Sequence, residues 1–279
     1  MPTPAEKRRI FRALHADGCF VLPNPWDVGS ARWLQSLGFK ALATTSSGVA
    51  WSAGCADGQL PLAAVLDHIR TISEASDLPV NADFIDGFAK EPEGVAANVT
   101  ACIATGCAGL SIEDSTGDPG APLHDFALAV ARVAAARTAV DAAGGDTLLI
   151  ARSECFLTGH PEPLKEAVRR LTAFAEAGAD CLYAPGAATA DDIATIVKAV
   201  APKPVNVLAR PNGLSVAALA DLGVRRVSVG GALARSAWAG FQRAAKELAE
   251  GGTFAWLGEA ASGGVLDAFF SEDSKRRAS

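Results

Sequence analysis

Residues 164–184 read LKEAVRRLTAFAEAGADCLYA, and this stretch holds a helix, a helix end and a strand in that order. Apolar side chains recur at positions 164, 167, 168, 171 and 174. This spacing places them on one face of a helix and leaves the charges in water. Gly178 can take the left-handed conformation that ends a helix. The run Cys181–Ala184 is too uniformly apolar for a half-exposed strand, so it predicts a strand buried on both faces.

Short apolar runs of this kind occur eight times along the chain. They are Cys19–Pro23, Ala41–Thr44, Val80–Asp83, Gly109–Glu113, Leu148–Ser153, Cys181–Ala184, Val205–Leu208 and Arg226–Val229. Segments of helical period lie between them, for example Leu62–Ala75, Pro92–Thr105, Phe126–Ala143, Leu164–Ala177 and Ser215–Leu222. A glycine stands at the same kind of helix-to-strand junction three more times, at Gly38, Gly106 and Gly223.

Strands that alternate with helices imply right-handed crossovers and a parallel sheet. Eight such units predict closure into a (β/α)8 TIM-type barrel, with the whole chain, residues 1–279, as one barrel domain. An open, doubly wound sheet is the alternative fold. It is disfavoured because no GxGxxG sequence follows the first strand.

The composition of the chain sets limits on its function. The 279 residues are 49% hydrophobic and 20% charged, with a net charge of −6, which supplies ample material for a core. No stripe of Lys and Arg of the kind that binds nucleic acid is present, and no apolar run reaches the roughly 20 residues that cross a bilayer. The N-terminus lacks the apolar segment of a signal peptide, and the six cysteines form no CxxC pair. We therefore expect reduced thiols and a cytoplasmic protein.

The last part of the chain, residues 253–279, is predicted to be a helical tail beyond the barrel. It follows a Gly-Gly break at residues 251–252 and contains three large apolar side chains, Leu266, Phe269 and Phe270. A segment this short cannot bury these side chains by itself. We therefore expect the tail to pack on the barrel or on a neighbouring subunit, in a homodimer or homotetramer.

In barrels of this kind the site forms at the carboxyl ends of the strands, from the loops that follow them. Asp83, Glu113 and Arg152 each follow apolar residues at the end of a predicted strand, which places three charges at the barrel mouth. Buried charges are costly unless they are paired or bound to a metal. Carboxylate oxygens suit Mg²⁺, with Mn²⁺ as the alternative, better than zinc, and the four histidines form no HxH or HExxH pattern.

Other polar residues near the strand ends have structural as well as functional interpretations. Asp57 precedes Gly58 and could be a turn residue, and Asp27 precedes a helix and could be its N-cap. Asp114 should point away from the barrel axis and form a salt bridge, because strand side chains alternate. The turn Thr45-Ser46-Ser47-Gly48 offers hydroxyls and backbone N–H groups for an anion or oxyanion pocket, where a facing Arg would clamp a carboxylate.

Taken together, these residues resemble the isocitrate lyase / phosphoenolpyruvate mutase superfamily, over about residues 19–245. The resemblance rests on five motifs in order: Pro23-Asn24-Pro25-Trp26-Asp27, Thr45-Ser46-Ser47-Gly48 with Asp57-Gly58, Pro79-Val80-Asn81-Ala82-Asp83, Gly109-Leu110-Ser111-Ile112-Glu113-Asp114-Ser115 and Ile150-Ala151-Arg152-Ser153-Glu154. It implies a Mg²⁺-dependent enzyme that breaks a C–C or P–C bond next to a 2-oxo carboxylate, through an enolate.

The resemblance also implies roles for individual residues. Asp57, Asp83 and Glu113 would hold Mg²⁺, largely through water. Ser47 and Gly48 would receive the carboxylate and enolate oxygens of a small carboxylate substrate. The implied catalytic residues are Ser47, Gly48, Glu113 and Arg152, and the implied substrate-binding residues are Thr45, Ser47, Gly48, Asp57, Arg152 and Asn206. A C-terminal helix swapped between paired barrels would account for the apolar tail.

The sequence also departs from the superfamily pattern. Asn81 stands where many members carry an aspartate that touches the metal, and Pro185 follows the sixth strand where members place a histidine. The Lys-Lys-Cys-Gly-His loop of isocitrate and methylisocitrate lyases is absent, and residues 115–122 lack the Lys and Arg of the phosphonate-mutase gating loop. Two other functions stay open at this point. Val229-Gly230-Gly231 could bind a phosphate, as in a phosphosugar isomerase, and Asn81 is compatible with a catalytically idle barrel.

Overall fold

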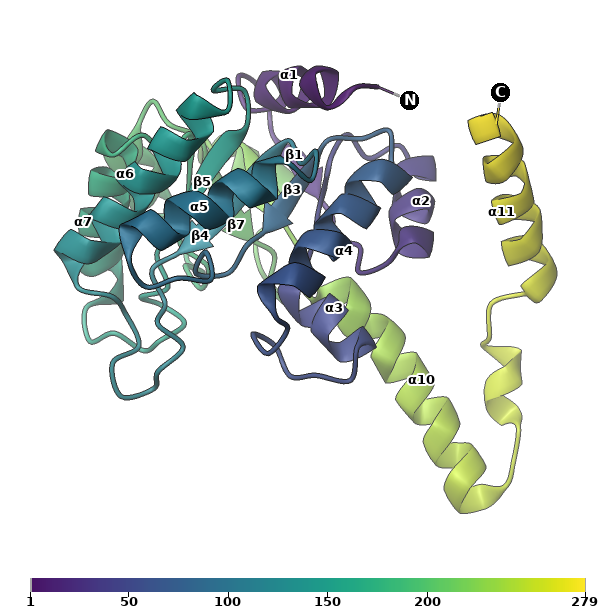
Figure 1. Ribbon diagram of the computed structural model, residues 1–279. Helices are drawn as coiled ribbons and strands as arrows, with labels where there is room; N and C mark the ends of the chain where they lie inside the picture. Colours follow the sequence, from purple (N-terminus) through teal and green to yellow (C-terminus); the bar gives the residue numbers. More distant parts are fainter. Residues whose placement is uncertain (1, 279) are drawn as a thin grey trace. The chain divides into compact units, whose positions relative to one another are not determined.

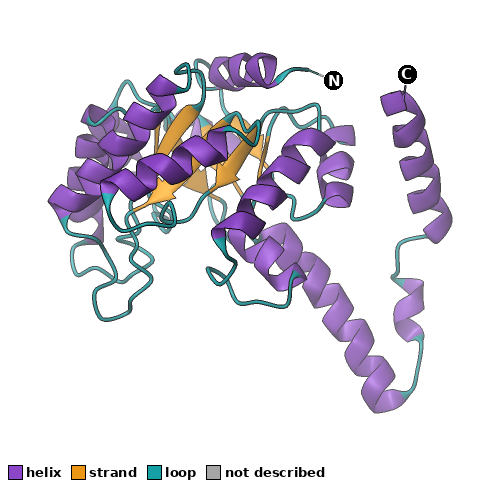
Figure 2. Cartoon of the chain, viewed as in Figure 1, coloured by secondary structure: helices purple, strands orange, loops and turns teal. Residues whose placement is uncertain are grey.

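The computed structural model of the protein describes residues 2–278. It comprises two compact units, residues 2–231 and residues 232–278. All strands among the described residues belong to the first unit, and the second unit is helical (Figure 2).

The first unit is a barrel of parallel strands surrounded by helices (Figure 1). Its eight strands, among residues 2–278, are β1 Phe20–Leu22, β2 Leu42–Ala43, β3 Val80–Asp83, β4 Gly109–Glu113, β5 Leu148–Arg152, β6 Cys181–Tyr183, β7 Val205–Leu208 and β8 Arg226–Ser228. They pair in the order β1-β8-β7-β6-β5-β4-β3-β2. Between β1 and β2 the Ala43 N–H donates to the Pro23 carbonyl at 3.0 Å, so the barrel is nearly closed. The predicted (β/α)8 barrel is confirmed.

Helices follow the strands and cover the outside of the barrel. They are α2 Val28–Ser36, α3 Ser46–Ser52, α4 Leu62–Ala75, α5 Pro92–Ile103, α6 Phe126–Ala142, α7 Pro163–Glu176, α8 Ala190–Val200 and α9 Val216–Asp221. The apolar stripe of α7 faces the sheet, as predicted, and its Leu171 is fully buried. Gly38, Gly106, Gly178 and Gly223 follow helices with φ of +83°, +86°, +102° and +88°. These angles confirm the predicted left-handed helix ends.

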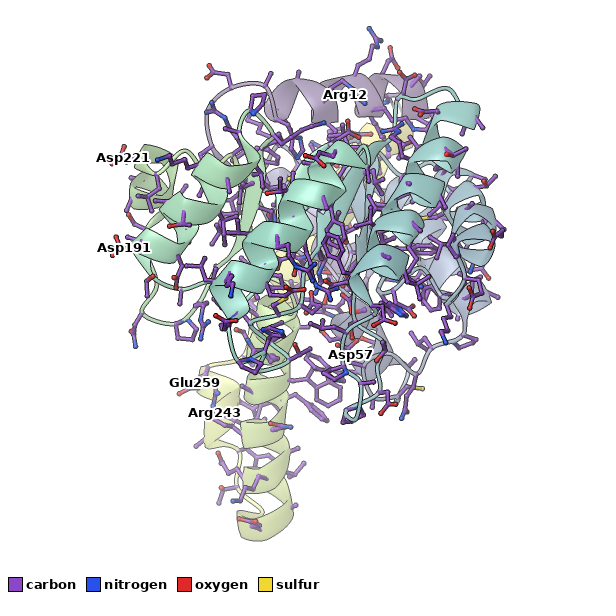
Figure 3. The ribbon with its side chains drawn as sticks, turned by 90° about the vertical axis from the view of Figure 1, so that its left-hand side faces the viewer. Arg12, Asp57, Asp191, Asp221, Arg243 and Glu259 are labelled. Carbon is purple, nitrogen blue, oxygen red and sulfur yellow. The ribbon has the colours of Figure 1, made fainter. Side chains whose placement is uncertain are left out.

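An additional helix, α1 (Pro4–Leu14), precedes the first strand and was not predicted. Thr3 caps it: the Glu6 N–H donates to Thr3 Oγ1 at 3.2 Å, and the Thr3 N–H donates to the Glu6 carboxylate at 2.8 Å. Phe11 of this helix is fully buried and packs with Phe20 in the interior of the barrel. Figure 3 shows Arg12 of α1 and Asp57 at opposite ends of the barrel. The helix therefore closes the end that lies away from the strands' carboxyl ends.

The interior of the barrel contains a polar network centred on Arg226, which is 2% exposed. Its Nε donates to Asn206 Oδ1 at 2.9 Å, and its Nη1 donates to Asn81 Oδ1 at 3.3 Å. Asn206 Nδ2 in turn donates to Ser228 Oγ at 3.0 Å. Burial lowers the pKa of Arg226, and no carboxylate contacts its guanidinium among residues 2–278. The network thus places one cation among neutral partners below the barrel mouth.

The second unit contains α10 (Ala232–Gly251), a 3₁₀ turn (Ala255–Gly258) and α11 (Gly263–Ala278). Gly252, with φ +61°, follows α10, so this helix ends at the predicted Gly-Gly break. The unit therefore includes α10 as well as the predicted tail, residues 253–279. No helix among residues 2–278 is both long and apolar enough to cross a membrane. Exchange of the tail between subunits stays a prediction.

Candidate active site

A cavity of about 550 Å³ opens at the carboxyl ends of the strands. Most of the site residues predicted from the sequence line it, namely Thr45, Ser47, Asp57, Asp83, Glu113 and Arg152. They come from the start of α3, the loop after α3, and the ends of β3, β4 and β5. The barrel therefore brings together residues that are far apart in the sequence. Gly48 and Asn206 were also predicted, but they do not line the cavity.

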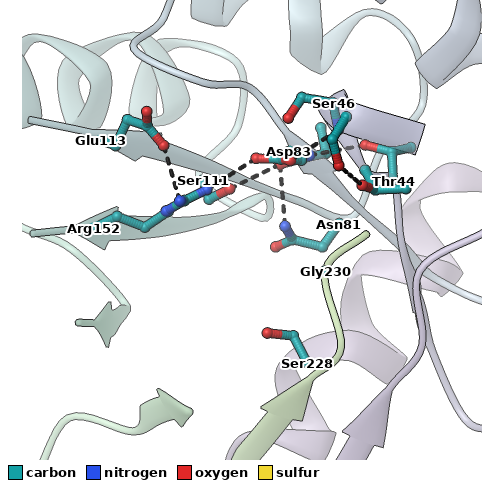
Figure 4. Close-up of polar contacts among 12 residues, drawn as sticks. Thr44, Ser46, Asn81, Asp83, Ser111, Glu113, Arg152, Ser228 and Gly230 are labelled. Atoms are coloured by element: carbon teal, nitrogen blue, oxygen red, sulfur yellow. Dashed lines mark hydrogen bonds and ion pairs between the residues drawn. The ribbon is translucent and has the colours of Figure 1, made fainter. Parts of the chain in front are cut away.

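Arg152 is the centre of the charged groups in this cavity (Figure 4). Its Nη1 lies 3.1 Å from Asp83 Oδ1, and its Nη2 lies 3.0 Å from Glu113 Oε2 and 2.8 Å from Glu154 Oε1. The guanidinium also stacks over the Tyr183 ring, 5.1 Å from its centre. Burial opposes the charge of Arg152, but the carboxylates raise its pKa well above the ordinary value. Arg152 is thus a fixed cation that holds three carboxylates together.

Glu154 was not predicted as a site residue, although it stands in one of the quoted motifs. It lines the cavity and is 5% exposed. The available signal was its distance of two residues from Arg152, since residues two apart on an extended chain face the same side. However, β5 ends at Arg152, and Glu154 lies beyond the strand. The strand pattern alone therefore does not predict on which side the Glu154 side chain lies.

The carboxylates in the cavity are crowded and partly desolvated. The pKa of Glu113 is raised to about 8, first by burial and then by the neighbouring Glu154 and Asp83, against the opposing effect of Arg152. Burial also raises the pKa of Glu154. Burial, followed by the repulsion of Asp83, raises the pKa of Asp57. Carboxyl groups under such mutual repulsion would be stabilised by a further cation.

The hydroxyl-rich turn after β2 starts helix α3 and contacts this group of carboxylates. The Ser46 N–H donates to Asp83 Oδ2 at 3.0 Å, and Thr45 Oγ1 lies 3.1 Å from Ser47 Oγ. The Gly48 N–H was expected to meet a substrate oxygen, and this stays a prediction. It donates to Thr45 Oγ1 at 3.3 Å because Thr45 is the N-cap of α3. The Ser47 N–H has no hydrogen-bond partner among residues 2–278, so it is the available donor of the turn.

A glycine of the opposite wall allows Ser47 to occupy its place. A Cβ atom at Gly231 would lie 2.6 Å from Ser47 Oγ, which is closer than real Cβ atoms approach such a neighbour. Gly231 also lines the cavity. The glycine thus permits the segment after β8 to approach the serine hydroxyl directly.

Asn24, just after β1, connects the segments that follow β2 and β8. Its Nδ2 donates to the Thr44 carbonyl at 2.9 Å. Its Oδ1 accepts the Val229 N–H at 3.1 Å and the Gly230 N–H at 2.9 Å. They are two of the N–H groups of the phosphate site suggested at Val229-Gly230-Gly231, and the asparagine already occupies them. The arrangement therefore does not favour the phosphate-binding isomerase.

Asn206 was predicted to bind substrate, and this stays a prediction. Its side chain is 1% exposed and belongs to the interior network with Arg226 and Ser228. Asn206 lies in β7, where its neighbours on both sides are also buried. Its depth below the mouth depends on the stagger between strands, which the strand pattern does not give.

Two acidic residues have the structural roles proposed for them. Asp27 is the N-cap of α2, where its Oδ1 accepts the Ser30 N–H at 2.7 Å. Asp114 points away from the barrel axis and pairs with Arg170 of α7, with Oδ2 and Nη1 3.1 Å apart. Neither residue lines the cavity. The charges available for chemistry are therefore those around Arg152.

The fold and the cavity define a (β/α)8 barrel with an acidic site at the carboxyl ends of its strands. The chain belongs to the phosphoenolpyruvate phosphomutase family, whose sequence profile matches residues 11–249. This family lies in the isocitrate lyase / phosphoenolpyruvate mutase superfamily, so the resemblance found in the motifs is confirmed.

Three individual proteins place the chain within the family. A crystal structure from Burkholderia cenocepacia is 44% identical, with a TM-score of 0.93 over 96% of this chain and 97% of the other. An oxaloacetate decarboxylase of Paraburkholderia xenovorans is 30% identical over 205 residues, which are 70% of this chain and 66% of the relative. A phosphonopyruvate hydrolase solved with oxalate and Mg²⁺ is 25% identical, with a TM-score of 0.84 over 97% of each chain.

Proposed function

We propose that the protein is a Mg²⁺-dependent lyase or hydrolase that breaks a C–C bond, or a P–C bond, next to a 2-oxo carboxylate through an enolate. The observation that carries this proposal is the grouping of Asp57, Asp83 and Glu113 around Arg152 in one cavity at the barrel mouth. Oxaloacetate decarboxylase, a relative, is named for a 2-oxo acid, and phosphonopyruvate hydrolase has been solved with Mg²⁺ and oxalate.

The donor set of the cavity fits a hydrated Mg²⁺ ion. All candidate ligands are carboxylate oxygens. The pKa values of Asp57 and Glu113 are raised first by burial and then by neighbouring carboxylates, and a nearby cation would favour their charged forms. Among residues 2–278, no three His, Cys, Asp or Glu side chains are grouped closely enough to bind a metal directly. Mg²⁺ keeps several of its waters in proteins, so binding through water agrees with this spacing. The ion would stabilise the charge that develops on the former keto oxygen.

The protein's own residues would orient the substrate. Nη1 of Arg152 contacts one acceptor, Asp83, so its second N–H remains available for the substrate carboxylate. The Ser47 N–H and hydroxyl face the same cavity and can donate to the developing oxyanion. A donor of this kind contributes roughly 3–4 kcal/mol to transition-state stabilisation. Glu113 and Glu154 fix the guanidinium and thereby the position of the carboxylate.

The test is calorimetric titration of the protein with Mg²⁺ and oxalate, because oxalate copies the planar enolate of pyruvate. We expect oxalate to bind only when Mg²⁺ is present. Asp83→Asn should weaken the Mg²⁺–oxalate complex by about 10–100-fold, the usual cost of losing a group that holds a metal through its outer shell. Asp191→Asn, at an exposed position of α8, is the control and should change nothing. Absence of oxalate binding at any Mg²⁺ concentration would favour the catalytically idle barrel.

Turnover distinguishes the proposal from the isomerase. We expect release of pyruvate or glyoxylate from a 2-oxo acid or 2-hydroxy diacid in the presence of Mg²⁺, with oxalate as a competitive inhibitor. Conversion of phosphosugars that oxalate does not inhibit would contradict the proposal.

A further inference from the structure

The charges that line the cavity are strongly unequal in sign. Of the described residues, Arg152 is the only cationic side chain in the lining. The acidic side chains in the lining are Asp57, Asp83, Asp86, Glu113 and Glu154. Arg152 is already paired with three of them. One bound Mg²⁺ and Arg152 together can therefore receive one substrate carboxylate, and no second cation is present for another anionic group.

Backbone and hydroxyl donors in the outer wall do not replace the missing cation, because they already have partners. The Gly117 N–H donates to Ser115 Oγ at 3.3 Å, and the Asp118 N–H donates to Thr116 Oγ1 at 3.0 Å. The Thr116 hydroxyl donates to the Ala121 carbonyl at 2.6 Å. The Gly230 N–H on the opposite wall is bound to an asparagine side chain. An anion could use these groups only by breaking existing hydrogen bonds.

Aliphatic side chains make up another part of the lining. Leu157, in the loop after β5, is 56% exposed, and Leu208 and Ile85 are partly buried in the same cavity wall. Ile85 adopts φ +46°, which is unfavourable for a β-branched residue. Its carbonyl accepts the Glu113 N–H at 2.9 Å, so the strained turn is fixed to the site itself. Backbone strain of this kind persists at functional sites.

We propose that the part of the substrate that leaves on bond cleavage is uncharged and partly apolar. This inference rests on the proposed function and narrows it to C–C cleavage. The class that fits is a 4-hydroxy-2-oxo acid with a short alkyl group at C4. Its single carboxylate and 2-oxo group would lie at the acidic end with Arg152, and its alkyl group would cover Leu157 and Ile85.

The reaction is a retro-aldol cleavage and needs no further reactant. The C3–C4 bond breaks, and its electron pair stays on C3 as the enolate of pyruvate. The 4-hydroxyl proton passes to a carboxylate of the cavity wall, and C4 becomes an aldehyde carbonyl. We assign this role to Asp86, which lines the cavity and is not paired with Arg152. The proton then returns to C3, so one substrate molecule yields one aldehyde and one pyruvate.

The test compares two oxamates of nearly equal shape, because oxamates copy the enolate and extend into the leaving-group side. N-isobutyloxamate carries an apolar branch where N-oxalylglycine carries a carboxylate. We expect calorimetry on the full-length protein with Mg²⁺ to give at least about tenfold tighter binding of N-isobutyloxamate, because an unpartnered like charge is costly. Tighter or equal binding of N-oxalylglycine would overturn the inference.

A charge introduced at Leu157 provides the second arm of the test. Leu157→Arg should strengthen the binding of N-oxalylglycine and weaken the binding of N-isobutyloxamate, so that their order of affinity reverses. Leu37→Arg, at a 62% exposed position outside the cavity, is the matched control and should leave both affinities unchanged. Binding of oxalate distinguishes failure of the leaving-group inference from failure of the proposed function. If oxalate binds and neither oxamate does, the leaving-group inference fails alone, and if oxalate does not bind, the proposed function fails as well.

Discussion

Replacement of Arg152 by glutamine is the most direct test of how the charges of the site are held. Arg152 is a 16% exposed guanidinium with Asp83, Glu113 and Glu154 at 3.1, 3.0 and 2.8 Å. Gross attraction to each carboxylate is on the order of 4 kcal/mol at the effective dielectric constant of a partly buried site, but desolvation offsets much of it. Loss of one partner from a buried ion pair costs about 3–5 kcal/mol. We expect that loss in Arg152→Gln, together with a melting temperature lowered by roughly 6–20 °C.

Mg²⁺ should restore part of this stability, because a divalent cation can take the place of the missing charge. A ligand at 100 times its dissociation constant stabilises the folded state by about 2.7 kcal/mol. The stabilisation by Mg²⁺ should therefore be larger in Arg152→Gln than in the unmodified protein. Scanning calorimetry with and without Mg²⁺ measures both quantities.

Two further variants make the result specific. Arg169→Gln removes an arginine that is 51% exposed in its pair with Glu166, and it should cost less than about 1 kcal/mol. Arg152→Lys keeps the charge but lacks the planar guanidinium. Its melting temperature should lie between those of Arg152→Gln and the unmodified protein. An unchanged melting temperature in Arg152→Gln, or equal stabilisation of both proteins by Mg²⁺, would refute the reasoning.

Three other predictions concern separate parts of the molecule. Burial lowers the pKa of His15 to about 3, so protonation favours the unfolded state, and stability is lost as the pH falls below about 6.5. The loss should reach about 3 kcal/mol at pH 4 and should be absent from urea unfolding of His15→Leu. Gly231→Ala should displace Ser47 and lower kcat with little change in melting temperature, which steady-state kinetics and calorimetry can separate. Truncation after Gly252 should lower the oligomeric state measured by sedimentation, because the tail side chains proposed to contact a partner subunit are lost.

The fold was predictable because its signals are local and repeated. The bounds of β3, β4 and β7 agree with the apolar runs, since strands buried on both faces have no alternation to obscure their ends. The helix ends were predictable from the glycines at the junctions, because only glycine takes those backbone angles at little cost. Helix α1 was not predicted, although Thr3 and Glu6 form a capping box, which is a sequence signal for a helix start.

A residue of the candidate site can be predicted from the sequence when its position at a strand end is enough to place its side chain at the barrel mouth. Asp83, Glu113 and Arg152 satisfy that condition, and they are in contact. Gly48 does not, because whether its N–H is available depends on the cap that Thr45 supplies. The role of Asn24 does not follow from the sequence, because its hydrogen bonds to Thr44 and Gly230 form only when the barrel closes. Contacts made by barrel closure are therefore what the sequence could not supply.

The role of the residue at position 81 depends on a contact that forms only in the closed barrel. In the sequence, Asn81 is a neutral residue where a metal-binding aspartate is expected, which suggests a weakened site. In the barrel, its Oδ1 accepts a hydrogen bond from Arg226 of β8, a cation whose other hydrogen-bond partner, Asn206, is also neutral. An aspartate at this position would meet Arg226 first, and the pair would add little net charge toward the metal. The neutral residue instead leaves the charge of Arg226 uncompensated below the acidic mouth, so positions 81 and 226 must be considered together in any account of the site's affinity for a cation.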